Sequence, residues 1–461
     1  MENPFDNNEH GNQAIRVIGI LEDAGLEAWL VGGCVRDALL GRPVHDFDIA
    51  CNALWSETKT VLEASGIHTV ETGIAHGTLT AISKGTPLEI TTYRIDGAYT
   101  DGRHPDSVQF TRSIQEDLAR RDFTINAMAW HPTRGLLDPF NGQADLHART
   151  LRAVGEPEKR FMEDALRILR GIRFASQLGF AIDQETASGM RAQASKLDLI
   201  AAERIAHELE GLLCGEHVHG ALMAYADVIG RVIPEITPMI GFDQKTKYHI
   251  YDVWEHTAYA VQYATPEPLT RWATLFHDIS KPSTFTVDEE GVGHFYGHAH
   301  EGIPLAKRAM KRLKMSPSFI ERVAMLVRYH DCPTIPEPKY VKRLLRKLDG
   351  DPDLLRALCS VKRADSLSHA PAYRSGVAHA QAIEDCLDLI LRESQPFTVA
   401  ALNISGKDLL AMGMPQGPHI GAALNAMLEA VMDETLPNER AALLRFAREW
   451  WSKRETEIKQ A

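Results

Sequence analysis

The sequence is poor in cysteine, in positive charge and in long hydrophobic runs, and each shortage excludes a class of protein. Its six cysteines among 461 residues stand without C-x-x-C spacing, which excludes a zinc ribbon and a disulfide framework and indicates reduced thiols. No segment approaches the roughly 18 apolar residues of a membrane-spanning helix. The polar, acidic start MENPFDNNEHGNQ is unlike a signal peptide. The sequence therefore predicts a cytoplasmic protein with no membrane partner.

Lysine and arginine number 50 against 62 aspartates and glutamates, which gives a formal net charge of −12. This balance argues against nucleic-acid binding, because phosphate contacts need positive side chains. Binding depends, however, on local patches rather than on the sum. Basic residues gather in two segments: Arg112, Arg120, Arg121, Arg149, Arg152, Lys159, Arg160, Arg167, Arg170 and Arg173, then Lys307, Arg308, Lys311, Arg312, Lys314, Lys339, Lys342, Arg343, Arg346 and Lys347. The second segment is equally typical of a solvated helix face.

The chain is long enough for two to four domains, and its hydrophobic pattern changes along its length. Residues 14–24 predict an amphipathic helix, and AWLV, HDFDIAC, LTAISKG and LEITTYR predict strands. From about residue 160 onward, Leu, Ile and Ala recur at helical spacing. We predict four parts: a mixed α/β unit at 1–150, a helical region at 151–240, a histidine-rich helical region at 241–372 and a helical tail at 373–461.

Two aspartates in the segment LVGGCVRDALLGRPVHDFDIA carry the sharpest chemical signal. Asp46 and Asp48 are two residues apart on a predicted strand, where a period of two places both carboxylates on one face. Converging carboxylates repel each other unless a cation lies between them, and Mg²⁺ prefers such hard oxygen ligands. Glu89, on a later predicted strand, is placed to be a third carboxylate. The alternative is a pair of solvent-facing aspartates on an edge strand.

Gly32 and Gly33 precede a predicted helix start in the same segment. Backbone N–H groups and the helix dipole favour an anion there, and the absence of a Cβ lets a triphosphate approach the backbone. Arg36, one turn into the helix, can add a charge-assisted contact. A phosphate-binding turn near a metal-binding carboxylate pair predicts phosphoryl transfer, with metals activating the attacking hydroxyl and steadying the leaving pyrophosphate.

These residues begin a longer series of motifs. GGCVRDALLGRPVHDFDIA resembles the signature of the class II tRNA nucleotidyltransferase and bacterial poly(A) polymerase superfamily, and RRDFTINAMAW, LLDPFNGQADL, RFMEDALRILRGIRF and ERIAHEL resemble that family's later motifs in the same order. The resemblance covers about residues 20–240. It implies an α+β protein with a polymerase-β-type nucleotidyltransferase head, followed by all-α neck, body and tail regions. It also implies that Mg²⁺ at the carboxylates supports CCA addition to tRNA from CTP and ATP.

The segment RFMEDALRILRGIRF is the candidate for reading the base. Asp164 and Arg167 are three apart on a predicted helix and would be neighbours on its surface, and an acceptor beside a donor suits the edge of cytosine. The resemblance makes this pair the amino-acid template and associates Arg170 and Arg173 with nucleotide contact. On a continuous helix Arg173 would lie almost opposite Asp164. Arg173 would then equally suit a structural salt bridge or a tRNA phosphate contact.

Two further segments concern the nucleotide. By the resemblance, Arg121 and Asp122 in RRDFT would meet the ribose and the triphosphate; the alternative is an interdomain ion pair. The polar segment 94–110 resembles the loop that accompanies addition of the terminal A, and its DGRHPDSV at 101–108 is intact. This favours full CCA addition or A-only addition over CC-only addition.

Histidines gather farther along the chain. An adjacent His-Asp pair inside the predicted apolar helix ATLFHDI is costly to bury without a metal or a partner. The region resembles the HD superfamily of metal-dependent phosphohydrolases, whose core ligand positions and additional two-metal positions match six residues: His256, His277, Asp278 and Asp365, then His298 and His330. Such ligands suit Ni, Mn, Fe or Zn better than Mg, and Lys281 is placed to stabilise the phosphate. The resemblance implies a phosphatase or 2′,3′-cyclic phosphodiesterase; the alternative is a scaffold that keeps its ligands.

Other functions remain open at the level of the sequence. A poly(A) polymerase shares the head and neck motifs, but it usually carries basic extensions and lacks an HD region. A phosphohydrolase could use the head only to grip RNA, although both aspartates of the head are intact. No residue distinguishes full CCA addition from A-only addition, and no stable protein partner is implied.

Overall fold

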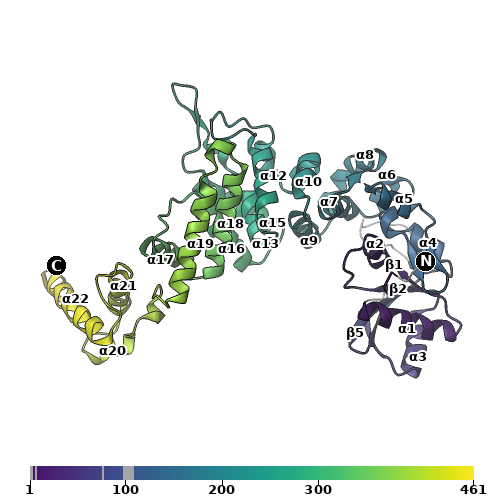
Figure 1. Cartoon of the computed structure of the whole chain (residues 1–461), viewed down its shortest axis with the longest axis horizontal. Helices are drawn as coiled ribbons and strands as arrows, with labels where there is room; N and C mark the ends of the chain where they lie inside the picture. Colours follow the sequence, from purple (N-terminus) through teal and green to yellow (C-terminus); the bar gives the residue numbers. More distant parts are fainter. Residues whose placement is uncertain (1–3, 6–7, 75–76, 97–107, 461) are drawn as a thin grey trace. The chain divides into compact units, whose positions relative to one another are not determined.

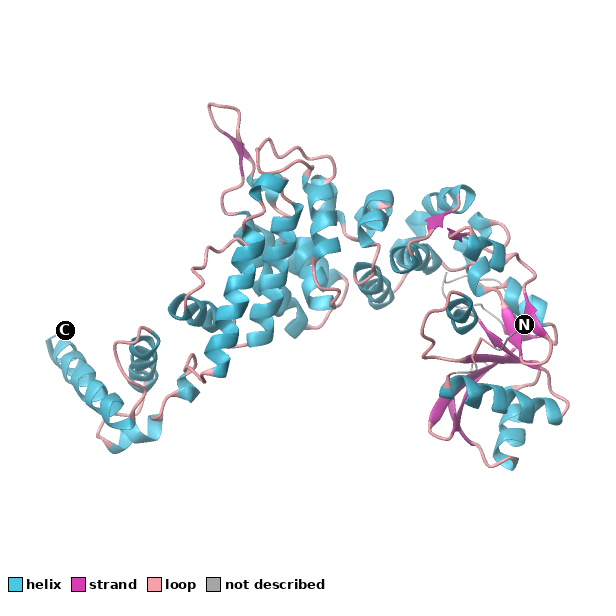
Figure 2. Ribbon diagram, viewed as in Figure 1, coloured by secondary structure: helices cyan, strands magenta, loops and turns pink. Residues whose placement is uncertain are grey.

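The computed structural model describes residues 4–5, 8–74, 77–96 and 108–460. It has an α+β architecture, with the large sheet near the N-terminus and helices through the rest (Figure 2). The chain divides into two compact units, residues 1–234 and 235–461. No helix in the described ranges is both long enough and apolar enough to cross a bilayer. The predicted fold class, a mixed sheet with helices followed by helical regions, is confirmed.

A seven-stranded mixed sheet organises the first unit, in the order β3-β4-β5-β2-β1-β8-β9. Its strands are β1 (Ala28–Val31), β2 (Asp48–Cys51), β3 (His68–Gly73), β4 (Thr78–Ser83), β5 (Thr86–Thr92), β8 (Ala129–His131) and β9 (Gly135–Leu137). Two smaller pairs are β6 (Arg94–Asp96) with β7 (Val108–Phe110), and β10 (Thr150–Leu151) with β11 (Ala181–Ile182). Neighbours in the large sheet are antiparallel except β2 and β5, which are parallel. This parallel pair places Glu89, in the middle of β5, beside Asp48 at the start of β2.

Burial explains the sequence pattern of the strands. β1, an inner strand, is buried at all four positions and reads as the continuous apolar run AWLV. β4 alternates between partly exposed and buried residues. Helices α1 (Glu9–Asp23) and α3 (Trp55–Ala64) contact each other and pack on the sheet (Figure 1). The helix predicted at 14–24 is confirmed, but it begins earlier because the Asn8 side chain accepts the Gly11 N–H and caps α1.

Helices complete the first unit. They are α2 (Gly33–Leu39), α4 (Ile114–Ala119), α5 (Gly142–His147), α6 (Pro157–Glu163), α7 (Leu166–Leu178), α8 (Gln184–Gln193), α9 (Ala202–Leu213), α10 (Val218–Ala224) and α11 (Ala226–Val232). The prediction of one continuous helix through RFMEDALRILRGIRF is wrong. The chain breaks between α6 and α7 because Asp164 takes an extended conformation, with φ −141° and ψ 104°. The α7 helix then packs on α9.

The second unit is helical in its described residues apart from a short hairpin of β12 (Thr286–Val287) and β13 (Gly293–His294). Its helices are α12 (Val253–Tyr263), α13 (Pro268–Phe276), α14 (Lys281–Thr284), α15 (His298–Arg312), α16 (Pro317–Tyr329), α17 (Pro338–Lys347), α18 (Pro352–Ser368), α19 (Gly376–Arg392), α20 (Gly406–Ala411), α21 (Pro418–Met432) and α22 (Arg440–Gln460). Helices α12, α13, α16 and α18 pack together, with Trp254 and Trp272 fully buried. The tail has its own apolar core, which includes Leu409, Met427 and Leu443.

Part of the second basic segment is engaged in ion pairs between helices. Lys339 and Arg343 of α17 lie 3.3 Å and 3.1 Å from the Asp433 carboxylate at the end of α21. Arg346 of α17 pairs with Glu429 of α21. These ion pairs connect α17 to the C-terminal end of α21, so these basic side chains are not simply a solvated helix face.

Candidate active sites

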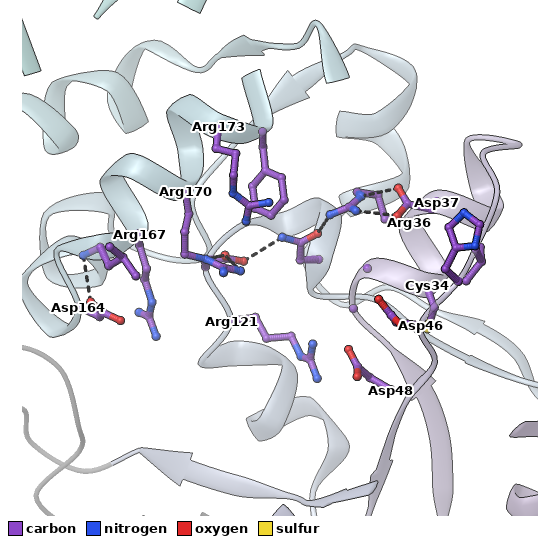
Figure 3. A pocket seen from close by; sticks show the side chains of 18 of the residues that line it. Cys34, Arg36, Asp37, Asp46, Asp48, Arg121, Asp164, Arg167, Arg170 and Arg173 are labelled. Atoms are coloured by element: carbon purple, nitrogen blue, oxygen red, sulfur yellow. Dashed lines mark hydrogen bonds and ion pairs between the residues drawn. The ribbon is translucent and has the colours of Figure 1, made fainter. Parts of the chain in front are cut away.

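A cavity of about 730 Å³ in the first unit gathers nearly all the residues predicted for nucleotide binding (Figure 3). The β1–α2 turn, the start of β2, the segment after α4 and the helix α7 each contribute to its wall. The predicted residues in its lining are Gly32, Gly33, Arg36, Asp46, Asp48, Arg121, Asp122, Asp164, Arg167, Arg170 and Arg173. Of the predicted set for this site, Glu89 is outside the lining. Residues more than a hundred positions apart in the sequence therefore share one cavity.

The carboxylates converge as expected, although by a different local structure. The strand β2 begins at Asp48, so Asp46 lies before the strand and the expected alternation along one strand is wrong. Both side chains line the cavity, and Glu89 of β5 lies opposite Asp48 in the parallel register. Burial is the largest cause of a raised pKa at Asp48; Arg121 opposes the rise, while Glu89 and Asp46 add to it. A cation would relieve this repulsion, so the donor set fits Mg²⁺.

The turn between β1 and α2 allows close approach to its backbone. Gly32 has a φ of +77°, in the left-handed region that glycine tolerates, and Gly33 begins α2. The Arg121 side chain lies against this turn, because a Cβ built on Gly32 would come within 2.7 Å of Arg121 Nη1. Cys34 follows in the cavity wall, where burial raises the pKa of its thiol to about 12.

Arg36 lies in the cavity wall with its charge already paired. Its Nε and Nη2 donate to the two carboxylate oxygens of Asp37 at 2.9 Å and 2.8 Å, and its Nη1 donates to Asn126 Oδ1 at 2.7 Å. A phosphate contact by Arg36 must therefore compete with Asp37. Neither partner was predicted from the sequence, and no periodicity links Arg36 to Asn126, which lies 90 positions away.

Asp122 and Arg170 form an ion pair between the head motif and α7, with their atoms 2.8 Å apart. The Asp122 carboxylate also accepts from the Asn126 side chain and from the Phe123 N–H. Burial acts to raise the pKa of Asp122, but Arg170 and the Asn126 amide outweigh it and lower the pKa. The ion pair given as the alternative for RRDFT is thus present, and Asp122 still lines the cavity.

Asp164 and Arg167 both line the cavity, but not as surface neighbours on one helix. Asp164 lies in the break between α6 and α7; its carboxylate accepts from the Leu166 N–H at 2.9 Å and from Arg204 at 3.0 Å. Arg167 pairs instead with Glu163 at 2.6 Å and donates to backbone carbonyls. The pair predicted to read the base is therefore assembled by a break in the helix and by partners from other elements.

The expectation that Arg173 lies opposite Asp164 is wrong for the same reason. The two residues do not share a helix, and both line the cavity. Arg173 nevertheless makes the salt bridge given as its alternative, with Nε 2.6 Å from Glu208 Oε2, and its guanidinium lies over the Phe174 ring. Glu208 comes from ERIAHEL, so that motif supplies a partner that residue spacing within α7 does not reveal.

A second group of converging side chains lies in the second unit. Ligand atoms of His256, His277, Asp278 and Asp365 lie within 4.8 Å of one another, and ligand atoms of Asp278, His298 and His330 do so as well. Asp278 belongs to both groups. All six predicted residues therefore come together, from helices as distant in sequence as α12 and α18.

The local geometry of this group differs from the prediction in one respect. Helix α13 ends at Phe276, so His277 and Asp278 follow the helix instead of lying inside it. His277 Nδ1 hydrogen-bonds the Thr274 carbonyl at 2.7 Å, which turns Nε2 toward Asp278 at 3.1 Å. A hydrogen bond from the other ring nitrogen fixes the orientation of a ligating imidazole in this way.

The electrostatics of the group fit cation binding. Burial lowers the pKa of His330 to about 3, and the nearby His277 and His298 add to the effect, so His330 stays in the neutral form that ligates metals. Burial also acts to lower the pKa of His277, but Asp278 and Asp365 outweigh it and raise the pKa to about 10. The buried Asp278 and the half-buried Asp365 both need a positive partner, and a divalent ion with imidazole ligands would provide one.

Two histidines beside this group were missed by the sequence analysis. His249 and His369 place ligand atoms within 4.8 Å of His256, yet no motif or spacing marks them. Lys281, predicted to stabilise a phosphate, is buried with its Nζ 2.7 Å from Asp278 and 2.9 Å from Gln244 Oε1. Its charge is thus committed to Asp278 in this arrangement.

Known families match four stretches of the chain. The models are the poly A polymerase head domain at residues 28–152, an RNA and SrmB-binding site of polymerase A at 179–239, the HD domain at 246–370 and the tRNA nucleotidyltransferase domain 2 at 365–447. The poly A polymerase head model covers the cavity's carboxylates and glycine turn, and the HD model covers all six residues of the histidine cluster.

Relatives match along almost the whole chain. The CCA-adding enzyme of Limosilactobacillus fermentum is 34% identical over 441 residues, which cover 94% of this chain and 95% of that protein. The CCA-adding enzyme of Leuconostoc mesenteroides is 35% identical over 438 residues, which cover 93% and 94%. This chain belongs to the CCA-adding enzymes. Matches of this length to CCA-adding enzymes disfavour both the poly(A) polymerase and the head that only grips RNA.

Solved CCA-adding enzymes share the fold. The Bacillus stearothermophilus CCA-adding enzyme in complex with CTP superposes with a TM-score of 0.73 at 29% identity, covering 99% of this chain and 100% of that one. The Thermotoga maritima CCA-adding enzyme complexed with tRNA-CCA has a TM-score of 0.56 at 20% identity, covering 96% of each chain. Residues 97–107, which hold nearly all of DGRHPDSV, lie outside the described residues, so the role of this segment in adding the terminal A stays a prediction.

Proposed function

We propose that this CCA-adding enzyme builds and repairs the 3′-terminal CCA of tRNA from CTP and ATP in the cavity of the first unit. One observation carries the proposal: a carboxylate pair, a glycine turn and the base-reading pair Asp164 and Arg167 line the same cavity. Template-independent addition needs all three, because the protein must bind the triphosphate, promote the transfer and choose the base.

The chemistry joins the tRNA 3′-oxygen to the α-phosphorus and breaks the bond to the leaving pyrophosphate. Asp46 and Asp48 would hold Mg²⁺, and Glu89 adds negative charge beside Asp48. When bound, Mg²⁺ stabilises the charge that develops on the attacking and leaving oxygens. The backbone at Gly32 and the Arg121 guanidinium orient the triphosphate, while Asp122 meets the ribose and fixes Arg170 beside it.

Base choice rests on Asp164 and Arg167. A carboxylate offers acceptors and a guanidinium offers donors, so together they match the amino, ring-nitrogen and carbonyl groups of cytosine. Arg204 and the Leu166 N–H hold Asp164, and Glu163 holds Arg167. A small adjustment of these contacts would suit adenine. Arg170 and Arg173 then contact the nucleotide from the adjoining turns of α7.

The direct test offers three tRNA transcripts: one lacking CCA, one lacking only the terminal A, and one complete. Each is given CTP, ATP or both. Addition of CCA followed by a stop, with no extension of the complete tRNA, is the expected result. An open-ended A tail would contradict the proposal in favour of poly(A) polymerase, and addition only to the second transcript would identify an A-adding enzyme.

Replacing Gly32 with alanine should raise the KM for CTP about tenfold, because a side chain in the left-handed region costs roughly 1–2 kcal/mol and relief of that strain moves the turn and Arg121. Steady-state kinetics on the CCA-lacking transcript measures this. Gly25→Ala is the matched control: Gly25 also has a positive φ, of +81°, but a Cβ there meets nothing within 4 Å. An equal rise in KM for Gly25→Ala would show that general backbone strain is responsible.

Arg167→Lys should reduce discrimination between correct and incorrect nucleotides about tenfold to a hundredfold, because lysine keeps the charge and loses the planar fork. Competition between CTP and UTP on the CCA-lacking transcript measures it. Arg191→Lys is the control, since Arg191 makes an exposed pair with Asp227 and is outside the cavity lining. Unchanged discrimination in Arg167→Lys would remove this residue from base reading.

The second unit supports a second activity, metal-dependent hydrolysis of phosphate esters at RNA ends, as a phosphatase or 2′,3′-cyclic phosphodiesterase. The observation in its favour is that Asp278 belongs to both ligand groups, as a residue shared by two adjacent ions would. When bound, such ions supply an activated water for attack on phosphorus. Ni, Mn, Fe or Zn suit the ligands. Hydrolysis of 2′,3′-cyclic AMP by the full chain with added Ni²⁺ or Mn²⁺ tests this function.

A further inference from the structure

Two cavities meet at the histidine cluster of the second unit. One, the Lys281 cavity, is lined by Asp278, Lys281 and His298, and the other, the Ser366 cavity, by Ser366, Tyr373 and Gly376. Tyr248, His330, Asp365 and His369 line both. Each has a volume of about 370 Å³, within the range of roughly 300–1,000 Å³ typical of small-molecule sites. A ligand whose phosphate lies at the cluster can therefore extend into the second cavity.

The Ser366 cavity is bordered by exposed aromatic rings. Tyr248 has 47% of its surface exposed, although it is a large side chain beside a buried cluster. Its ring lies 4.8 Å from the Tyr373 ring in an edge-on arrangement, and Lys247 Nζ lies within 5.5 Å of the Tyr248 ring centre. Exposed aromatic faces beside a cation are the means by which proteins stack single bases next to a phosphate backbone.

The backbone of Tyr248 is hydrogen-bonded beside the histidine cluster. Its backbone carbonyl accepts the Ala370 N–H at 2.9 Å, directly after His369, and its own N–H donates to Thr246 Oγ1 at 3.2 Å. The backbone that carries the ring is therefore anchored beside the residue that follows His369, which limits the backbone entropy lost on binding.

A buried hydroxyl points to a polar ligand in the same cavity. Ser366 is 4% exposed, and its Oγ has no hydrogen-bond partner among the described residues. Such an atom is costly to bury unless a ligand or a water satisfies it. A Cβ on Gly376 would come within 2.8 Å of this oxygen, so the absence of a side chain there leaves the space beside the hydroxyl unfilled. A hydroxyl can donate to or accept from the edge of a base.

We propose that the Ser366 cavity is a nucleobase subsite, in which a base stacks on Tyr248 and its edge hydrogen-bonds to the Ser366 hydroxyl. The inference rests on the proposed phosphohydrolase function and narrows its substrate class. The second unit acts on a phosphate carried by a terminal nucleotide, such as a nucleoside 2′,3′-cyclic phosphate at an RNA end, in preference to the same phosphate without a base.

The test uses the full chain loaded with Ni²⁺ and two cyclic diesters, 2′,3′-cyclic AMP and glycerol 1,2-cyclic phosphate, which lacks a base. Phosphorus NMR follows the opening of both rings. We expect the wild type to prefer 2′,3′-cyclic AMP. Tyr248→Ala should lower kcat/KM for it by about 5-fold to about 100-fold, mainly through KM, since one stacked base contributes that much. The same variant should leave the glycerol substrate unaffected, and Tyr248→Phe should retain the preference.

Tyr263→Ala serves as the matched control, because Tyr263 is a similarly exposed tyrosine that lines neither cavity. Equal kcat/KM for both substrates in the wild type would overturn the base subsite and leave the hydrolase function standing, as would an equal loss on both in Tyr248→Ala. Hydrolysis of neither substrate would overturn the hydrolase function instead. Calorimetry then decides the subsite on its own: 2′-AMP should bind more tightly than glycerol 2-phosphate, and Tyr248→Ala or Ser366→Ala should abolish the difference.

Discussion

Asp48→Asn should lower the addition of both C and A by at least about a thousandfold, the scale of losing a principal electrostatic contribution to phosphoryl transfer. The amide keeps the size of the side chain and removes the charge at the first residue of β2, beside Asp46 and opposite Glu89. Single-turnover incorporation of labelled CTP on a CCA-lacking transcript, and of ATP on a CC-ending one, measures the loss.

The same variant carries its own control. Asp48 and the histidine cluster belong to separate compact units, so any cyclic-phosphate hydrolysis of the second unit should persist in Asp48→Asn. Asp227→Asn, a change of the same type at an exposed ion pair with Arg191, should leave nucleotide addition intact. If Asp48→Asn loses A addition but keeps C addition, Asp48 serves nucleotide choice and the assignment to the transfer step fails.

Asp278→Asn should abolish binding of the two transition-metal ions proposed for the second unit and lower hydrolysis of 2′,3′-cyclic AMP at least about a thousandfold. The reason is that this one carboxylate belongs to both ligand groups. Elemental analysis after loading with Ni²⁺ should fall from about two ions per chain to near zero. Nucleotide addition should be retained.

Single-group variants sharpen this prediction. His298→Asn should remove one ion and His256→Asn the other. The reason is that each histidine belongs to only one of the two ligand groups that share Asp278. Asp288→Asn is the control, since Asp288 pairs with His294 in the exposed hairpin outside both groups. Retention of one ion in Asp278→Asn would show that this carboxylate is not shared between two ions.

The features that followed from the sequence depend on short-range pattern. The strand AWLV, the glycine turn and the helix after it form where the sequence predicts them, because local propensity and burial agree there. The six HD residues could be named because the region resembles the HD superfamily, whose ligand positions they match. Even Glu89 could be placed near Asp48, although only the parallel pairing of β2 and β5 explains why.

The features that did not follow depend on contacts between distant segments. The helix break at Asp164 contradicts good helical periodicity, and its carboxylate is held by the Leu166 N–H and by Arg204 from α9. Asp122 is paired with Arg170 across 48 positions of sequence. Residue spacing within one element cannot reveal such partners. The predicted side chains therefore line the cavity, but Asp164 and Arg167 do not share the continuous helix that the spacing predicts.

Cys34 contributes a sulfur atom to the wall of the cavity in the first unit. It lies in the same wall as the glycine turn, its thiol hydrogen-bonds the Val31 carbonyl at 3.2 Å, and burial raises its pKa to about 12. Peroxides and alkylating reagents attack the thiolate and not the thiol. Burial therefore favours the thiol form of Cys34, which reacts slowly, next to the glycine turn that we propose to bind the triphosphate.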